Sequence, residues 1–177
     1  FREFNKAYLT DEKNPVYILN MGQAQQSKDN FLEAEILFQE AWNLDLEDYS
    51  PPRALASLYF YKLGKKRKAY NTLEKAIEAD GLLDFQDFFC IFDKITYYSF
   101  ENNKAGLRRE MTRVKEIAIN DNEKDFAGYM LSTHGVELNT HKMFDISIEY
   151  LKTAHQLVPD NEEIKTEFTR TKKNSAI

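Results

Sequence analysis

The residues with the clearest chemical potential are three histidines and their acidic neighbours. His141 and Asp145 are four residues apart, a spacing at which two side chains of one helix can hold the same metal ion. A metal site needs three or more converging ligands, and His134 and His155 need not share the face of His141. The sequence therefore favours a solvated helix start at His141, an outer-face position for His155 and no metal.

Cys90 is the only cysteine, which excludes a disulfide within the chain. It lies in the apolar run 88–92, where burial in a core is more plausible than the activating base that a catalytic thiol needs. The six glycines are scattered singly, so no phosphate-binding loop is present, and no two carboxylates stand out as an acid/base pair. These observations predict a protein that is not an enzyme and that uses no cofactor.

The one basic cluster spans residues 62–68 and contains five Lys or Arg residues. It could bind an acidic partner or act as a nuclear address, but lysines are also common in exposed turns, and we favour the turn. The net charge of −5 argues against nucleic-acid binding, and no apolar run approaches the length of a membrane span. We expect one soluble domain, with a cytoplasmic location suggested by the single thiol.

A repeated stripe of small and large side chains must position any working surface. Ala34, Phe38 and Ala41 fall on one helix face, and the same spacing recurs 35 residues later at Ala69, Leu73 and Ala76. Phe4 and Ala7 lie 34 residues before Phe38 and Ala41, and Leu151 and Ala154 continue the series near the end of the chain. Gly22 and Gly135 occupy matching positions where helices can approach closely, and Pro159 matches a closing proline.

This period and pattern resemble the tetratricopeptide repeat (TPR) family. The resemblance implies an all-α, right-handed α-solenoid of antiparallel helix pairs. We expect four pairs, at residues 14–46, 50–80, 83–119 and 123–159, with flanking helices at 1–9 and 161–173 in one domain. Because the first helix lacks a partner and the chain begins at Phe1, we also expect a fragment of a longer protein.

Capping signals mark the expected helix starts. Asn14 and Ser50 each precede proline, Asn30 begins a capping box with Glu33, and Asp84 begins the third pair. This third pair fits the pattern least well. Its first helix carries a phenylalanine-rich face, with Lys94 expected on the opposite, polar face.

The resemblance also implies a concave groove lined by the first helix of each pair, which takes a peptide or a partner segment. The expected lining residues are Leu19, Gln23, Gln26, Ala54, Leu58, Tyr61, Lys62, Phe92, Thr96, Ser99, Ser132, Val136 and Asn139. Ordinary packing between helices is the alternative for each. Leu19 and Gln23 stand where chaperone-binding members have Lys and Asn, so that basic clamp is not expected.

The most plausible function is therefore a protein–protein interaction scaffold whose partner is a protein or a peptide. Two alternatives remain open. One is a regulatory or sensor solenoid coupled to another domain of a longer protein. The other is a self-association module, in which exposed apolar faces at the solenoid ends form a homodimer.

Overall fold

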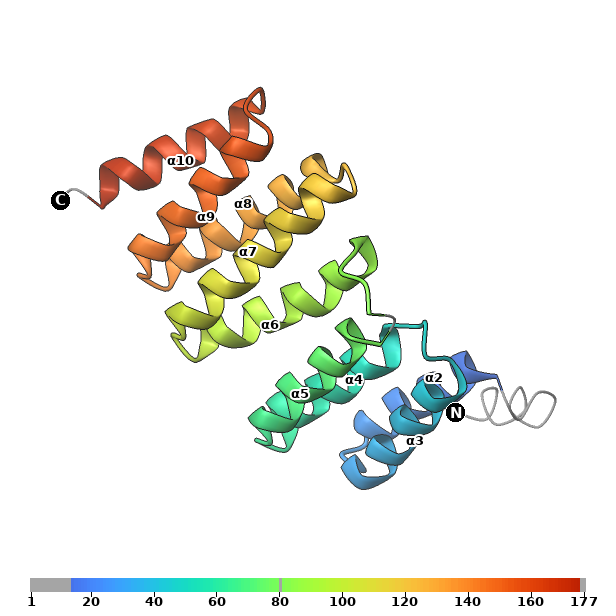
Figure 1. Ribbon diagram of the computed structural model, residues 1–177. Coiled ribbons are helices and arrows are strands. Elements are labelled where there is room, and N and C mark those ends of the chain that lie inside the picture. Colours follow the sequence, from blue (N-terminus) through green and yellow to red (C-terminus); the bar gives the residue numbers. More distant parts are fainter. Residues whose placement is uncertain (1–13, 80, 176–177) are drawn as a thin grey trace. The chain divides into compact units, whose positions relative to one another are not determined.

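The computed structural model describes residues 14–79 and 81–175, and these residues form helices and turns without a β-strand (Figure 1). The predicted all-α class is confirmed. Contacts divide the chain into two compact units, Phe1–Leu82 and Leu83–Ile177. The expected helix at 1–9, including Phe4 and Ala7, lies outside the described residues. None of the helices described is both long and apolar enough to cross a membrane.

The first unit begins with the antiparallel pair α2 (Pro15–Gln26) and α3 (Phe31–Leu44). Asn14 caps α2 as predicted, because its side chain accepts a 3.0 Å hydrogen bond from the backbone N–H of Val16. The capping box predicted at Asn30 is wrong. The Asn30 amide instead donates to Gln25 Oε1 at 2.9 Å, which ties the turn to the end of α2.

The second pair of this unit contains a feature that the sequence did not reveal. Helix α4 (Ser50–Ser57) continues into a π-helical turn, η1 (Leu58–Lys62), and α5 (Lys66–Ile77) follows. Ser50 is the first helical residue rather than the predicted cap, and Tyr49 precedes it. A π turn inserts one extra residue, so it re-aims the side chains that follow it. Gly64 then reverses the chain with a positive φ of 64°.

The core of the first unit contains the small–large–small stripe. Ala34, Phe38 and Ala41 of α3 are fully buried, and Gly22 of α2 faces the Phe38 ring. A Cβ atom added to Gly22 would lie 2.5 Å from that ring, which shows how closely α2 and α3 approach. Ala69, Leu73 and Ala76 occupy the buried face of α5.

The second unit consists of a short 3₁₀ turn and the helices that follow it side by side in Figure 1. Their bounds are η2 (Phe85–Asp87), α6 (Phe88–Phe100), α7 (Lys104–Asn120), α8 (Lys124–Thr140), α9 (Phe144–Leu157) and α10 (Glu162–Asn174). Asp84 and Asp87 form a capping box at the start of η2, which confirms a helix start there. Helix α8 continues through Asn139 to Thr140, and His141 follows it as the C-cap residue.

Three turns of the second unit share one backbone device. Asn102, Asn122 and Lys142 each have a positive φ, between 53° and 62°, at the turns that follow α6, α7 and α8. Asparagine tolerates this left-handed conformation better than other residues with side chains, and two of the three positions use it. Each of these turns reverses the chain, so consecutive helices of this unit run antiparallel.

An aromatic cluster joins the first helices of the second unit. The ring of Phe126 in α8 lies 5.5 Å from Phe88 and 6.5 Å from Phe92 of α6, between centroids. Phe85 and Phe89 complete the cluster at 5.4 Å and 6.3 Å from Phe126. Edge-to-face and tilted contacts of this kind add to the free energy of burial, so the phenylalanine-rich face of α6 serves as packing.

The polar face predicted for Lys94 is wrong. Lys94 is 1% exposed, and its ammonium lies 2.9 Å from Oε1 of Glu110, which is fully buried on α7. Arg109 and Arg113 contact the same carboxylate at 2.9 Å and 3.3 Å. A buried charge requires a partner, and α7 supplies it. The third helix pair is therefore centred on a buried ion pair, although Lys94 was expected on the polar face of its first helix.

Candidate functional site

The histidines and the cysteine do not assemble a reactive centre. Within residues 14–79 and 81–175, no three His, Cys, Asp or Glu side chains lie close enough to hold a metal ion. Cys90 is fully buried. Asp145, paired with His141 in the sequence, is engaged by Lys104 at 2.8 Å. The outer-face position predicted for His155 is wrong, because its ring lies 6.1 Å from Phe168 of α10 and its Nδ1 is buried.

Two lysines of the basic cluster form ion pairs with an acidic residue of the first unit. Lys65 and Lys68 lie 3.6 Å and 3.4 Å from the carboxylate of Glu35 on α3, and both ammonium groups sit over the ring of Tyr59. The Tyr59 hydroxyl donates to Glu35 at 2.7 Å. Burial, together with this acceptor, raises the pKa of Tyr59 well above its usual range. These lysines therefore fasten α5 to α3.

In the first unit, a polar hollow of about 280 Å³ brings together part of the predicted groove. Gln23 and Gln26 of α2 line it with Lys62 of the π turn, and Ser27 and Asp29 complete it. The side chains available there are amides and one ammonium, which suit hydrogen bonds to a peptide backbone. All three predicted residues point into one hollow although Lys62 lies 36 residues beyond Gln26.

The other residues predicted for the first unit's groove lie elsewhere. Leu19 is 7% exposed and Leu58 is fully buried, so both belong to the core and are not available to a ligand. Tyr61 is half exposed, and Ala54 is intermediate. Neither of these two lines the hollow.

In the second unit, a groove of about 280 Å³ runs between α8 and α10. We call it the α8–α10 groove. Ser132 and Val136, both predicted, line it. The remaining lining residues were not predicted: Tyr129, Thr133, Asn161, Glu163, Ile164 and Glu167.

Four further predicted residues of this unit lie outside that groove. Thr96 of α6 is half-buried and its hydroxyl donates to Phe92 O at 3.0 Å. Ser99 is half-buried, and Phe92 is 5% exposed because it packs against neighbouring rings. Asn139 of α8 is half-buried, and its Oδ1 is buried without a hydrogen-bond partner in the part of the chain that the structure describes.

Comparisons with known proteins bear on the fold. No family model and no curated protein matches the sequence. Among solved structures, YrrB, described as a TPR protein with an unusual peptide-binding site, superposes with a TM-score of 0.53 at 17% identity, covering 98% of this chain and 84% of YrrB. The chain has a TPR fold.

Two other solved structures give lower scores. A TPR repeats protein from Bacteroides fragilis has a TM-score of 0.47 at 16% identity, covering 97% of this chain and 88% of that protein. The Cut9–Hcn1 hetero-tetramer of APC/C has a TM-score of 0.49 at 12% identity, covering 98% of this chain and 39% of the matched chain. At such identities the likeness concerns the fold.

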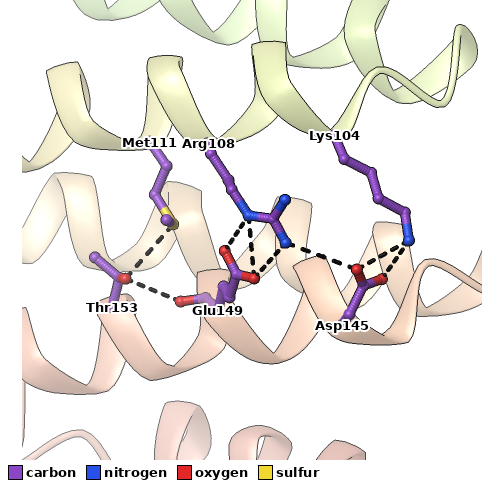
Figure 2. A network of polar contacts seen from close by, with 6 residues as sticks. All are labelled: Lys104, Arg108, Met111, Asp145, Glu149 and Thr153. Carbon is purple, nitrogen blue, oxygen red and sulfur yellow. Dashed lines mark hydrogen bonds and ion pairs between the residues drawn. The ribbon is translucent and has the colours of Figure 1, made fainter.

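Second helices of this TPR fold carry an ion-pair network of their own (Figure 2). Lys104 and Arg108 of α7 contact Asp145 and Glu149 of α9, and the Arg108–Glu149 pair is bidentate, with a shortest distance of 2.7 Å. Nearby, the Thr153 hydroxyl lies 3.5 Å from the sulfur of Met111. These charges already satisfy one another, so this surface is less suited to a charged partner than the α8–α10 groove.

His134 of α8 is a largely buried ionisable group, with 12% of its side chain exposed. Its ring stacks on Phe92 at 5.3 Å between centroids, with 14° between the planes. Burial lowers the pKa of His134, while the nearby carboxylates of Glu137 and Asp93 oppose that shift. The neutral imidazole is therefore the form that the folded state favours.

We expect the second unit to lose stability as the pH falls below the ordinary histidine value of 6.5. The unfolded chain takes up a proton there, whereas folded His134 does so only at lower pH, so protonation favours unfolding. Urea unfolding followed by circular dichroism at several pH values measures this. His134→Leu should remove part of the pH dependence and His141→Leu, at an exposed position, should not. Identical pH profiles for the two variants would contradict the assignment.

Proposed function

We propose that this chain is a protein-interaction module that holds an extended segment of a partner along the first helices of its repeats. The observation that carries this proposal is the pair of hollows, one in each unit, lined from α2 and the π turn and from α8 and α10. Both contain residues that the TPR resemblance assigned to a groove. YrrB, which shares the fold, is itself described as having a peptide-binding site.

The chemistry of the hollows supports an extended peptide over a compact small molecule. Each hollow is open and combines amide or hydroxyl groups with only a few charges. Such groups can satisfy the backbone N–H and C=O groups of a strand-like segment, while partly apolar surfaces such as Val136 receive its side chains. Within the described residues, no cluster of metal-ligating side chains offers a different activity.

A selection from a displayed library of random peptides tests this proposal. Binding of the selected peptides is then measured by fluorescence anisotropy for the wild type and for Gln23→Ala and Tyr129→Ala. We expect one or both variants to bind about tenfold more weakly, the loss typical of removing an important interface side chain. Which variant responds identifies the unit that holds the peptide.

Matched control variants lie on the second helices. Gln39→Ala and Ile36→Ala remove an exposed amide and a half-exposed apolar side chain from α3, and both should leave affinity unchanged within about twofold. Thermal unfolding checks that all four variants remain folded. Failure to select any peptide, or equal losses in groove and control variants, would overturn the proposed function.

A further inference from the structure

The α8–α10 groove has an uncompensated negative charge. Its acidic lining residues are Glu163 and Glu167, and no Lys, Arg or His lines it. Glu163 has no hydrogen bond or ion pair within residues 14–79 and 81–175, whereas Glu167 pairs with Arg170 one turn later. The Asn161 side chain caps α10, because its Oδ1 accepts a 3.1 Å hydrogen bond from the backbone N–H of Ile164.

Helix capping alone does not account for both carboxylates. An acidic residue in the first turn complements the positive end of the helix dipole, which explains Glu162 and contributes at Glu163. That effect fades within one turn, so it does not explain Glu167, which also lines the groove. Two carboxylates one turn apart on one side of α10 instead create a surface that attracts a cation.

A serine hydroxyl on the largely buried side of α8 faces the same groove. Ser132 is 8% exposed, lines the groove, and makes no hydrogen bond to any residue that the structure describes. Next to it, the Thr133 hydroxyl donates to Tyr129 O at 3.1 Å, so its oxygen can still accept. The Ser132 oxygen is not among the fully buried polar atoms that lack a partner, so a ligand in the groove can reach it and form a hydrogen bond with it.

Both helices also contribute apolar surface to the groove. Val136 is half-buried, Ile164 is 3% exposed, and the Tyr129 ring is 63% exposed beside them. An aliphatic side chain, or the methylene stem of a lysine or arginine, can pack against such a surface while a cationic head reaches a carboxylate.

Building on the proposed function, we propose that the α8–α10 groove binds an extended basic segment of a partner protein. One Lys or Arg of that segment contacts Glu163, with Glu167 adding to the negative potential. A nearby aliphatic residue packs on Val136 and Tyr129, and the segment's backbone carbonyl accepts from the Ser132 hydroxyl. The complementary charge also excludes acidic peptides and nucleic-acid phosphates from this groove.

An oriented peptide library tests the partner chemistry. Each library member fixes one amino acid at one position and leaves the neighbouring positions random, and the purified full chain is applied to the array. We expect the wild type to select Lys or Arg at one position and Leu, Ile or Val close to it. Raising the salt concentration should weaken the preference for the basic residue, because exposed ion pairs are screened.

Charge reversal supplies the decisive variant. Glu163→Lys should weaken binding of the selected basic peptides by about tenfold and shift the preference toward Asp or Glu. Glu116→Lys is the matched control, because Glu116 is exposed on α7 and equally lacks an ion-pair partner within the described residues. This control has the same net charge and should retain the preference of the wild type. Ser132→Ala should weaken binding of all selected peptides without changing the charge preference.

The outcomes separate this inference from the proposed function. Selection of peptides without a basic preference, or equal behaviour of Glu163→Lys and Glu116→Lys, overturns the inference while peptide binding stands. Binding lost only in Gln23→Ala does the same, because it places the segment in the first unit. If no library peptide binds, both proposals are wrong.

Discussion

Replacing Glu110 by glutamine is expected to lower the free energy of unfolding of the second unit by about 3–5 kcal/mol, the range observed when one partner of a buried ion pair is removed. Lys94 is 1% exposed and has its ammonium 2.9 Å from the Glu110 carboxylate. Without that carboxylate, a positive charge remains in the core, where water cannot solvate it. Arg109 and Arg113 also lose their anionic partner, but they are more exposed and can reach water.

A double variant distinguishes the ion pair from simple packing. Lys94→Met combined with Glu110→Leu replaces both charges by apolar side chains, and such replacements are often neutral or stabilising. We therefore expect the double variant to be far more stable than Glu110→Gln. Urea unfolding of the variants, followed by circular dichroism, provides the comparison. A double variant as unstable as Glu110→Gln would show that the charges themselves are not the source of the effect.

The burial of Lys94 and Glu110 could not be predicted from the sequence. The spacing of Leu107, Met111 and Val114 correctly indicated an apolar stripe on α7, but Glu110 lies between Leu107 and Val114 on the same face. Lys94 lies next to Ile95 in a helix whose apolar residues occur on nearly every side. Periodicity alone does not tell a buried charge from an exposed one, because burial depends on a partner 16 residues away.

The repeating parts of the fold were the most predictable. Helix period, proline after Asn14 and glycine at position 64 are local signals, and each corresponds to a helix, a cap or a turn in the structure. The π turn at 58–62 is different, because it carries no residue signature. Lys62, at the end of this turn, lines the hollow of the first unit, whereas Leu58, at its start, lies in the core although it was expected in the groove.

The α8–α10 groove was predictable on one side only. Ser132 and Val136 were implied by the TPR resemblance, and Tyr129 lies three residues before Ser132 on the same helix face, so helical spacing could have added it. Glu163 and Ile164 come from α10, which the sequence suggested only as a polar covering helix. The opposite wall depends on how α10 packs against α8, and no spacing within either helix specifies that.

Removing the Phe38 ring is expected to destabilise the first unit by about 3–5 kcal/mol, the usual effect of truncating a fully buried phenylalanine to alanine. The ring fills the space above Gly22, where an added Cβ would lie 2.5 Å from Cε1 and 2.6 Å from Cδ1. Gly22→Ala alone should therefore destabilise as well, by about 1–3 kcal/mol, because the ring must move out of its place.

The two changes together should cost less than their sum. In the Gly22→Ala, Phe38→Ala double variant, the new methyl group enters the space that the ring has left, and alanine also favours the helix over glycine by about 1 kcal/mol. Hydrogen exchange at the amides of α2 and α3, together with urea unfolding, measures each variant. Leu32→Ala, at a position 76% exposed on α3, is the control and should change stability by less than about 0.5 kcal/mol. Strict additivity would mean that Gly22 and Phe38 do not share one packing contact, and the close approach of α2 and α3 would then need a different cause.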